Sequence, residues 1–321
     1  MAQNPSKLPP EVWNNVFGYL SATEKLNVRA TCKYFKTIVD HRSLWKNWTV
    51  VLDFKNGSYN RKFWDTLRHR KVSSAVMKST KVKHWKQLAL FLPILTTVVM
   101  DQSSQECFSC LKDFPNMRRL VLRSSCSDLL LDISRFPLFL PEKLTYLSMC
   151  GVMFPTTSVS KFISVLSQFK NLDSLICHQV GIVGETMWML HSTLACLPKL
   201  KHLSLSGITS KDMAAIAVQL PNLLHLHIDT WPSHLGTRTA EIPRLFPKLK
   251  SLKIRHERVP EQDFLQLRHL QHLRYLEILD STPQLSVLTG KLQALTEFRL
   301  QIRIFPYRRD ALSCPCVCHV Y

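Results

Sequence analysis

A short apolar motif, [L/F]-P-x-L-x-x-L-x-L, recurs along most of this chain of 321 residues and limits the folds that the chain can adopt. Clear copies read FPNMRRLVL from Phe114, LPKLKHLSL from Leu197 and FPKLKSLKI from Phe246. Nine copies align on the first apolar residue of their L-x-L, which is Val98, Leu120, Leu147, Leu175, Leu203, Leu226, Leu252, Leu276 or Phe298. One copy could arise by chance in a leucine-rich chain, but nine copies at steps of 22 to 28 residues indicate a structural repeat.

The length of the repeat indicates the architecture. Steps of about 20 to 29 residues are typical of leucine-rich repeats. Each L-x-L alternation predicts a short strand with two side chains directed inward, and the segments between strands, such as 160–169 and 211–220, have the apolar spacing of helices. Because no unit can bury its own apolar face, the units must stack. The sequence therefore predicts an α/β fold, a right-handed solenoid over residues 91–305 with parallel strands on its concave face and helices on its convex face.

Residues 8–48 do not follow this repeat, and they predict a small helical module. Two prolines followed by Glu11 are typical of the first turn of a helix, and apolar residues then keep helical spacing as far as Leu20. A second helix is expected from Thr23 and a third from Cys32. The spacing alone is consistent with any small domain of three helices.

The residues of this module, read in order, resemble an F-box. The matching residues are Leu8-Pro-x-Glu, Val16-Phe-x-Tyr-Leu20, Leu26-x-Val28-Arg29, Cys32-Lys-x-Phe35, Asp40 and Leu44-Trp45-Lys46. An F-box followed by leucine-rich repeats is similar to the F-box/leucine-rich-repeat family of substrate receptors, and the resemblance covers residues 8 to about 303. It implies that a short trihelical F-box docks a Skp-type adaptor, which in turn binds the cullin scaffold of a ubiquitin ligase.

The resemblance also implies which side chains contact the adaptor. They are Leu8, Pro9, Val16, Leu20, Leu26, Cys32 and Trp45. A second interpretation applies to Leu20, Leu26 and Phe35, because helical spacing alone would bury them between the helices. The departures from the family's pattern are Ser21 in place of proline, Lys25 in place of an apolar residue, Thr31 in place of valine and Phe35 in place of tryptophan.

These patterns divide the chain into five segments. They are a flexible N-terminus at 1–7, the F-box at 8–48, a basic linker and N-terminal cap of the solenoid at 49–90, about nine leucine-rich repeats at 91–305 and a Cys-rich extension at 306–321. The first residues have no apolar stretch of the kind found in signal peptides, and no stretch reaches the roughly 18 apolar residues of a membrane span. We therefore expect a protein of the cytoplasm and/or the nucleus.

Positive charge concentrates between the helical module and the repeats. The chain has 42 Lys and Arg against 23 Asp and Glu, a net charge of +19, and residues 55–86 hold ten of these bases against the single acid Asp65. Bases mixed with aromatic residues suit phosphate contact and base stacking. The favoured alternative is a helix that caps the solenoid, with one apolar side and one solvated side. The apolar side would hold Phe63, Trp64 and Leu67, and the solvated side Arg61, Lys62, Arg68 and Arg70.

Outward positions of the strands form a second candidate surface. Arg and Tyr, which are enriched in interface hot spots, recur at the x positions of x-L-x-L-x. The residues expected to contact an acidic or phosphorylated protein substrate are Arg119, Arg123, Tyr146, Lys253, Arg255, Tyr275 and Arg299. His202 and His225 hold equivalent places on neighbouring strands and could bind a metal or sense pH. Ordinary polar contacts with the substrate are the favoured interpretation of both histidines.

The sequence holds no motif for catalysis or for a cofactor. It has only 8 Gly, lacks the glycine-rich loops of nucleotide enzymes, and contains neither H-E-x-x-H nor G-x-S-x-G. The pair Cys107 and Cys110 has no second pair at zinc-site distance, which favours a location in a helix. The C-terminal cluster of Cys314, Cys316, Cys318 and His319 could bind a soft metal or accept lipid, but an extension of unassigned role is favoured. We expect no metal, no cofactor and no enzymatic activity.

These observations favour a substrate-recognition subunit of a Skp–cullin–F-box ubiquitin ligase, which presents its substrate for ubiquitination and proteasomal degradation. Such a subunit raises the effective concentration of substrate lysines near the ubiquitin-conjugating enzyme. Two alternatives remain open. One is a basic leucine-rich-repeat protein that binds RNA or another polyanion through residues 55–86 and the concave face, and the other is an F-box protein that acts with its adaptor outside ubiquitination. Nucleic acid is the less favoured partner, and no need for homo-oligomerisation is expected.

Overall fold

The computed structural model divides the chain into two compact units, Met1–Met117 and Arg118–Tyr321. The residues that it describes are 8–46, 48–55, 57–101, 105–123, 142–154, 159–178, 180–182, 194–206, 208, 210–229, 239–255, 259–279 and 285–305. The expected N-terminal segment 1–7 and the Cys-rich extension 306–321 lie outside the described residues.

The first unit begins with three helices, as the sequence predicts. They are α1 (Pro10–Gly18), α2 (Ala22–Thr31) and α3 (Lys33–Val39), followed by the 3-10 helix η2 (Arg42–Trp45). Ser21 begins α2 with a capping box. Its hydroxyl accepts a hydrogen bond from the backbone N–H of Glu24 at 3.3 Å, and the Glu24 carboxylate accepts one from the backbone N–H of Ser21 at 2.7 Å. Serine therefore defines the start of α2 at a position where the F-box pattern has proline.

Parallel strands follow in the same unit. β1 (Thr49–Asp53), β2 (Ser74–Lys78) and β3 (Thr97–Asp101) alternate with α4 (Arg61–His69) and α5 (Val82–Phe91), and the 3-10 helix η3 (Gln105–Asp113) follows β3. The strand register aligns Val50 with Ala75, and Ala75 with Val98. Repeat geometry therefore begins at β1, and the expected linker and cap at 49–90 contain two strand–helix units. The repeat motif did not identify these strands, because TVVLD and SAVMK are not preceded by its [L/F]-P-x-L part.

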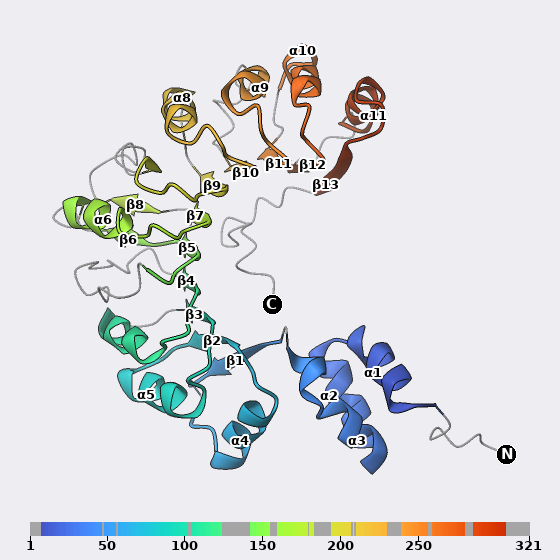
Figure 1. Ribbon diagram of the computed structural model, residues 1–321, viewed down its shortest axis with the longest axis vertical. Helices are drawn as coiled ribbons and strands as arrows, with labels where there is room; N and C mark the ends of the chain where they lie inside the picture. Colours follow the sequence, from blue (N-terminus) through green and yellow to red (C-terminus); the bar gives the residue numbers. More distant parts are fainter. Residues whose placement is uncertain are drawn as a thin grey trace. The chain divides into compact units, whose positions relative to one another are not determined.

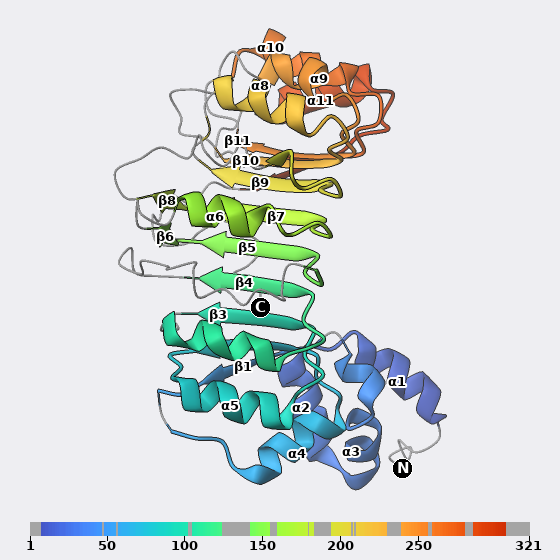
Figure 2. The same ribbon diagram turned by 60° about the vertical axis from the view of Figure 1, so that its left-hand side comes forward.

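The second unit is a parallel sheet with helices along one face. Its principal strands are β4 (Arg119–Arg123), β5 (Tyr146–Cys150), β7 (Ser174–His178), β9 (His202–Ser206), β10 (His225–Asp229), β11 (Ser251–Arg255), β12 (Tyr275–Leu279) and β13 (Gln301–Phe305), which neighbour one another in this order. Figure 2 shows β4, β5, β7 and β9 running in the same direction. β6 (Met153–Phe154) and β8 (Gly181–Ile182) form a separate small sheet.

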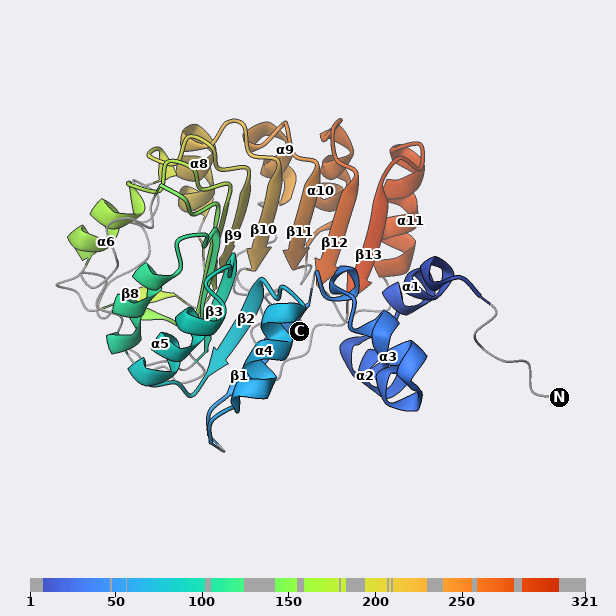
Figure 3. The ribbon, with the colours of Figure 1, turned by 60° about the horizontal axis from the view of Figure 1, so that its bottom comes forward.

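Helices connect these strands on the outer side. They are α6 (Val159–Leu166), α8 (Ser210–Gln219), η7 (Thr239–Glu241), α9 (Ile242–Leu245), α10 (Glu261–Leu265), η8 (Gln266–His269) and α11 (Leu285–Leu295). Figure 1 shows α8 to α11 along one side of β9 to β13, and Figure 3 shows these strands side by side. The leucines of the motif lie between strands and helices, with Leu203, Leu252 and Leu276 all 0% exposed. The predicted α/β fold of parallel strands backed by helices is confirmed. None of the helices within the described ranges is long and apolar enough to cross a membrane.

The last repeat differs from the sequence prediction. The strand expected at Phe298 is wrong, because β13 spans Gln301–Phe305 and Ile302 is in register with Leu276. Two apolar alternations, FRL and then IRI, follow each other here, and the fold uses the second. Glu297 and Phe298 have left-handed backbone conformations, with φ of 52° and 56°, which a strand cannot accommodate. The Phe298 side chain is therefore 76% exposed instead of buried.

Candidate functional site

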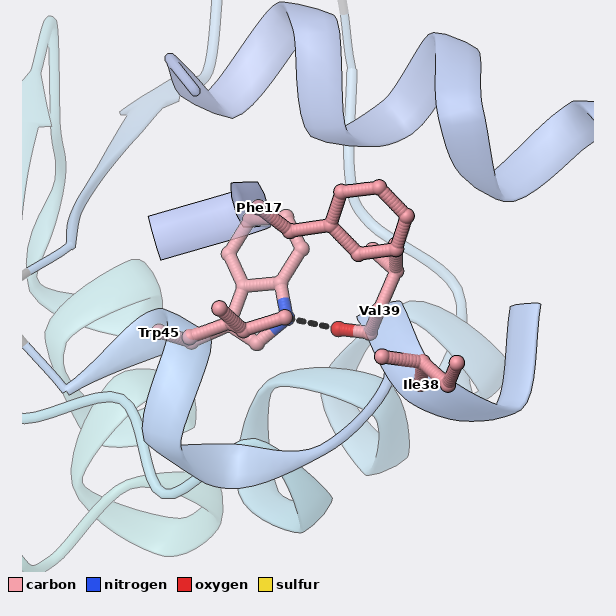
Figure 4. Close-up of a cluster of buried hydrophobic side chains, with 5 residues drawn as sticks. Phe17, Ile38, Val39 and Trp45 are labelled. Atoms are coloured by element: carbon pink, nitrogen blue, oxygen red, sulfur yellow. Dashed lines mark hydrogen bonds between the residues drawn. The ribbon is translucent and has the colours of Figure 1, made fainter. Parts of the chain in front are cut away.

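An aromatic cluster packs the N-terminal helices together. Trp13 and Phe17 of α1 stack with ring centroids 5.5 Å apart, and Phe35 of α3 meets them edge-on at 4.8 and 5.3 Å. Phe17 is 3% exposed and belongs to one buried cluster with Val39 and Trp45 (Figure 4). This core occupies one face of α1, and an adjacent face of the helix lies outside it.

That adjacent face presents apolar side chains to solvent. Val12 is 40% exposed, Val16 is 45% exposed and Tyr19 is 93% exposed. Their spacing of four and three residues places them on one side of the helix, and Leu8, which is 46% exposed, precedes them. We call Leu8, Val12, Val16 and Tyr19 the α1 stripe. An exposed apolar patch of this kind marks a protein-interaction surface.

Most of the predicted adaptor contacts are on the surface. The exposed ones are Leu8, Pro9, Val16, Leu26 and Cys32. Leu20 and Phe35 are half-buried and pack against the hydrophobic core, in agreement with the alternative of internal packing. The sequence prediction did not include Val12 and Tyr19, although their helical spacing from Val16 places them on the same exposed side of the helix.

Trp45 does not lie on the surface, contrary to its assignment as an adaptor contact. Its side chain is 0% exposed, and its indole Nε1 donates a hydrogen bond to the carbonyl oxygen of Val39 at 2.6 Å (Figure 4). The guanidinium of Arg70 lies over the indole, 3.8 Å from the ring centroid. Trp45 therefore contributes to the core and joins the helical module to the end of α4.

Asp40 forms a second contact between the helical module and the first repeat. Arg70 Nη2 lies 2.8 Å from Asp40 Oδ1, and Arg29 Nε lies 2.7 Å from the same oxygen. Burial acts to raise the pKa of Asp40, but the hydrogen bonds and the positive charges of both guanidinium groups together lower that pKa below its usual value. Arg70 is only 4% exposed, so its predicted place on the solvated side of a helix is wrong.

On the strand face of the second unit, part of the predicted substrate surface is accessible. Arg119 is exposed, and its guanidinium stacks over the Tyr146 ring, 3.9 Å from the centroid. Tyr275 is 52% exposed. Lys253 is half-buried, and its Nζ lies 3.2 Å from the Glu277 carboxylate, so its charge is already paired.

The remaining predicted arginines contribute little to this surface. Arg123 is 8% exposed and Arg255 is 7% exposed. Arg299 precedes β13, and its predicted position in the strand is wrong. Its guanidinium donates to backbone carbonyl oxygens of the preceding repeat within 268–271, two of these hydrogen bonds being 3.2 Å long. Positive charge on the strand face is therefore less accessible than the sequence predicts.

Histidines gather on three neighbouring strands, β7, β9 and β10. The rings of His202 and His225 are 5.8 Å apart, and burial is the main cause that lowers the pKa of each. The Ser204 hydroxyl lies 2.6 Å from His178 Nε2 and 2.7 Å from His227 Nδ1, and all three side chains are buried. Burial first, and then the charges of neighbouring groups, lower the pKa of His227 well below its usual value. Within the described ranges, no group of three or more potential ligands is placed to hold a metal ion.

The aromatic residues of the basic segment 55–86 are not available for base stacking. Trp64 and Trp85 are both 0% exposed. Tyr59 and Phe63 are half-buried, and their rings stack on each other with centroids 4.5 Å apart. The apolar side of α4 therefore packs into the first unit, as the cap interpretation expects.

Cys107 and Cys110 lie in η3, in agreement with the predicted helical location. They are 0% and 4% exposed. Burial is the main cause that raises the pKa of the Cys110 thiol. A buried thiol with a raised pKa is a poor metal ligand, because ligation needs the thiolate.

Comparisons with known proteins find one family match, in the N-terminal helices. Residues 5–49 match the family model described as F-box-like. A search of curated protein sequences finds no significant match to this chain. Among solved structures, an internalin (inlF) from Listeria monocytogenes is 17% identical, with a TM-score of 0.41, and the match covers 77% of this chain and 73% of that chain. The structure of a TLR13–ssRNA13 complex is 16% identical, with a TM-score of 0.43, and the match covers 84% of this chain and 38% of that one.

Proposed function

We propose that this chain, in which an F-box-like domain at residues 5–49 precedes leucine-rich repeats, is the substrate-recognition subunit of a Skp–cullin–F-box ubiquitin ligase. The coarser role, a protein-interaction adaptor, follows from these two parts together. The observation that carries the proposal is the α1 stripe, because α1 buries one apolar face in the core and exposes a second. Covering the stripe with an adaptor removes apolar surface from water, which contributes about 25 cal/mol per Å².

The repeats supply the second binding surface of the proposed subunit. The exposed Arg119 forms a cation–π pair with the half-buried Tyr146, and Tyr275 is exposed on β12, farther along the same sheet. Side chains of these types are common in interface hot spots, and an arginine pairs with acidic or phosphorylated residues. Ubiquitination and proteasomal degradation of the substrate would follow from proximity, because one chain holds both partners.

The proposed subunit makes and breaks no bonds itself and uses no cofactor. Its partners are a Skp-type adaptor, the cullin scaffold behind it and a protein substrate. We place it in the cytoplasm and/or the nucleus, where these partners would meet it.

Co-purification of the full chain with a Skp-type adaptor tests the docking step. Val12→Glu together with Val16→Glu should reduce the adaptor recovered by about tenfold or more, because the interface would have to bury carboxylates. Val218→Glu together with Val287→Glu is the matched control, since these valines of α8 and α11 are 82% and 64% exposed. Unchanged adaptor recovery with the stripe variant would contradict the proposal. An adaptor complex that never supports ubiquitin transfer to a bound partner would instead favour an F-box protein acting outside ubiquitination.

Polyanion binding is the second candidate function, and the exposed bases of the first unit favour it. RNA binding through these bases should weaken steeply as salt increases. Because Trp64 and Trp85 are fully buried and the half-buried Tyr59 and Phe63 stack on each other, single strands would gain few stacking contacts. This role would not need the α1 stripe, so the stripe variant separates the two candidates.

A further inference from the structure

Helices α4 and α5 of the first unit carry five exposed bases. The exposed bases of these helices are Arg61, Lys62 and Arg68 of α4 and Lys83 and Lys86 of α5. The two helices pack against each other, since the Trp64 ring of α4 stacks on the Phe91 ring of α5 with centroids 5.3 Å apart. We call these five bases the basic α4–α5 face.

None of these five bases forms an ion pair among the residues that the structure describes, although the exposed Asp65 lies on the same side of α4, four residues after Arg61 and three before Arg68. The ion pairs described in the first unit are those of Asp40 with Arg29 and Arg70, which lie inside it. Lys83 and Lys86 are three residues apart on one side of α5, where like charges repel. An acidic partner would relieve this repulsion and would be steered towards the face.

An exposed leucine continues the face along α5. Leu90 is 75% exposed and follows Lys83 and Lys86 at the spacing that keeps all three on one side of the helix. Ile94, just beyond the end of α5, is 41% exposed. An apolar end beside a row of bases does not suit nucleic acid, which gains from charge and from aromatic stacking. It suits a protein segment that combines acidic with apolar residues.

We infer that the basic α4–α5 face, extended by Leu90, docks an acidic protein segment that carries a large apolar side chain. Carboxylates of the segment lie against the bases, and its apolar side chain covers Leu90. The inference rests on the proposed function for its biological meaning, because the segment belongs to a recruited substrate. It adds an acidic contact on the helices of the first unit to the one proposed at Arg119 of the strand face, where Arg123 and Arg255 are buried.

Fluorescence anisotropy with labelled peptides and the full chain tests the inference. The first probe is a short peptide rich in Asp and Glu with leucines at i and i+4 spacing, the second has serine in place of leucine, and the third is a DNA duplex. Lys83→Glu together with Lys86→Glu should weaken binding of the leucine peptide by about tenfold or more at low salt. Leu90→Ser should weaken the leucine peptide by about threefold to tenfold and leave the serine peptide unchanged.

The control variant is Lys161→Glu together with Arg244→Glu, which reverses two exposed bases on α6 and α9 of the second unit. It should bind all probes like the unaltered chain. Undiminished binding by the Lys83→Glu, Lys86→Glu variant would overturn the inference, as would tighter binding of the duplex than of the leucine peptide. Co-purification of each variant with the Skp-type adaptor measures the docking step separately from peptide binding. Weaker peptide binding with unchanged adaptor recovery would show that the substitution affects the basic α4–α5 face alone. Lower adaptor recovery by the Val12→Glu, Val16→Glu variant with unchanged peptide binding would show that this variant affects the docking step alone.

Discussion

Arg70 reaches back along the chain to Asp40, with its Nη2 2.8 Å from the carboxylate oxygen, while its guanidinium carbon lies over the Trp45 ring. The side chains come from the end of α3, from η2 and from the end of α4. The helical module and the first repeat therefore share a core, in a region where the sequence predicts a basic linker.

Arg70→Ala should lower the free energy of unfolding of the first unit by about 2 kcal/mol. The substitution removes one of two cationic partners of the partly buried Asp40 and leaves a void over Trp45. Urea unfolding followed by tryptophan fluorescence measures the change. Arg68→Ala, at an exposed position of the same helix, should change stability by less than about 0.5 kcal/mol. If both substitutions changed the free energy of unfolding by the same small amount, the contacts of Arg70 with Asp40 and Trp45 would add no stability.

Trp45→Phe should destabilise the fold by about 1 to 2 kcal/mol without changing adaptor affinity. The substitution leaves the Val39 carbonyl oxygen without the hydrogen bond that the buried indole donates. Thermal unfolding gives the first quantity, and titration calorimetry with the adaptor gives the second. Val16→Glu should show the opposite pattern, because Val16 is 45% exposed. A loss of adaptor affinity by folded Trp45→Phe protein would restore Trp45 as a contact.

The second unit should lose stability as the pH falls below about 6.5, the usual pKa of histidine. His227 has a lower pKa in the fold than in the unfolded chain, so the unfolded chain binds more protons over this range and acid favours it. The loss stops once the pH passes below the pKa in the fold, and each unit of difference corresponds to about 1.4 kcal/mol.

Urea midpoints of the chain measured from about pH 8 to about pH 5 test this dependence. His227→Gln should flatten the curve, whereas His272→Gln, at an exposed position, should leave its slope unchanged. A curve of His227→Gln that runs parallel to that of the unaltered chain would rule out His227 as the source.

Arg299→Ala should lower the free energy of local unfolding of the last repeat by about 1 to 2 kcal/mol. The reason is that backbone carbonyl oxygens in 268–271 lose the hydrogen bonds that the guanidinium donates. Hydrogen exchange should become faster in β13 than in β12. Arg303→Ala, which alters an exposed side chain of β13 itself, is the control and should leave exchange unchanged. Unaltered exchange in Arg299→Ala would mean that these hydrogen bonds contribute nothing.

Apolar periodicity predicted most of the fold, because burial between sheet and helices requires leucine at alternate strand positions such as Leu203 and Leu252. It failed at β13, where two alternations compete and only pairing with β12 favours Ile302 over Phe298. It also failed at β1, where Val50 and Leu52 are buried as in the other strands but no [L/F]-P-x-L precedes them.

The sequence predicted only part of the candidate docking site. The order of motif residues identified Leu8, Val16 and Leu26, which are all exposed. Burial of Trp45 and Arg70 could not be predicted, because it depends on contacts between segments distant in the chain, which no local spacing encodes.

The hydroxyl of Ser204 has one proton and stands between two ring nitrogens, those of His178 and His227. When this hydroxyl donates a hydrogen bond to one ring it accepts one from the other, so the three side chains form a hydrogen-bond chain in which all donors point the same way. To reverse the direction of this chain, each of the two imidazole rings must change to its other tautomer at the same time. The tautomers of the histidines on β7 and β10 are thereby coupled through Ser204 on β9. A substitution at any one of the three positions changes the hydrogen bonds of side chains in the neighbouring repeats.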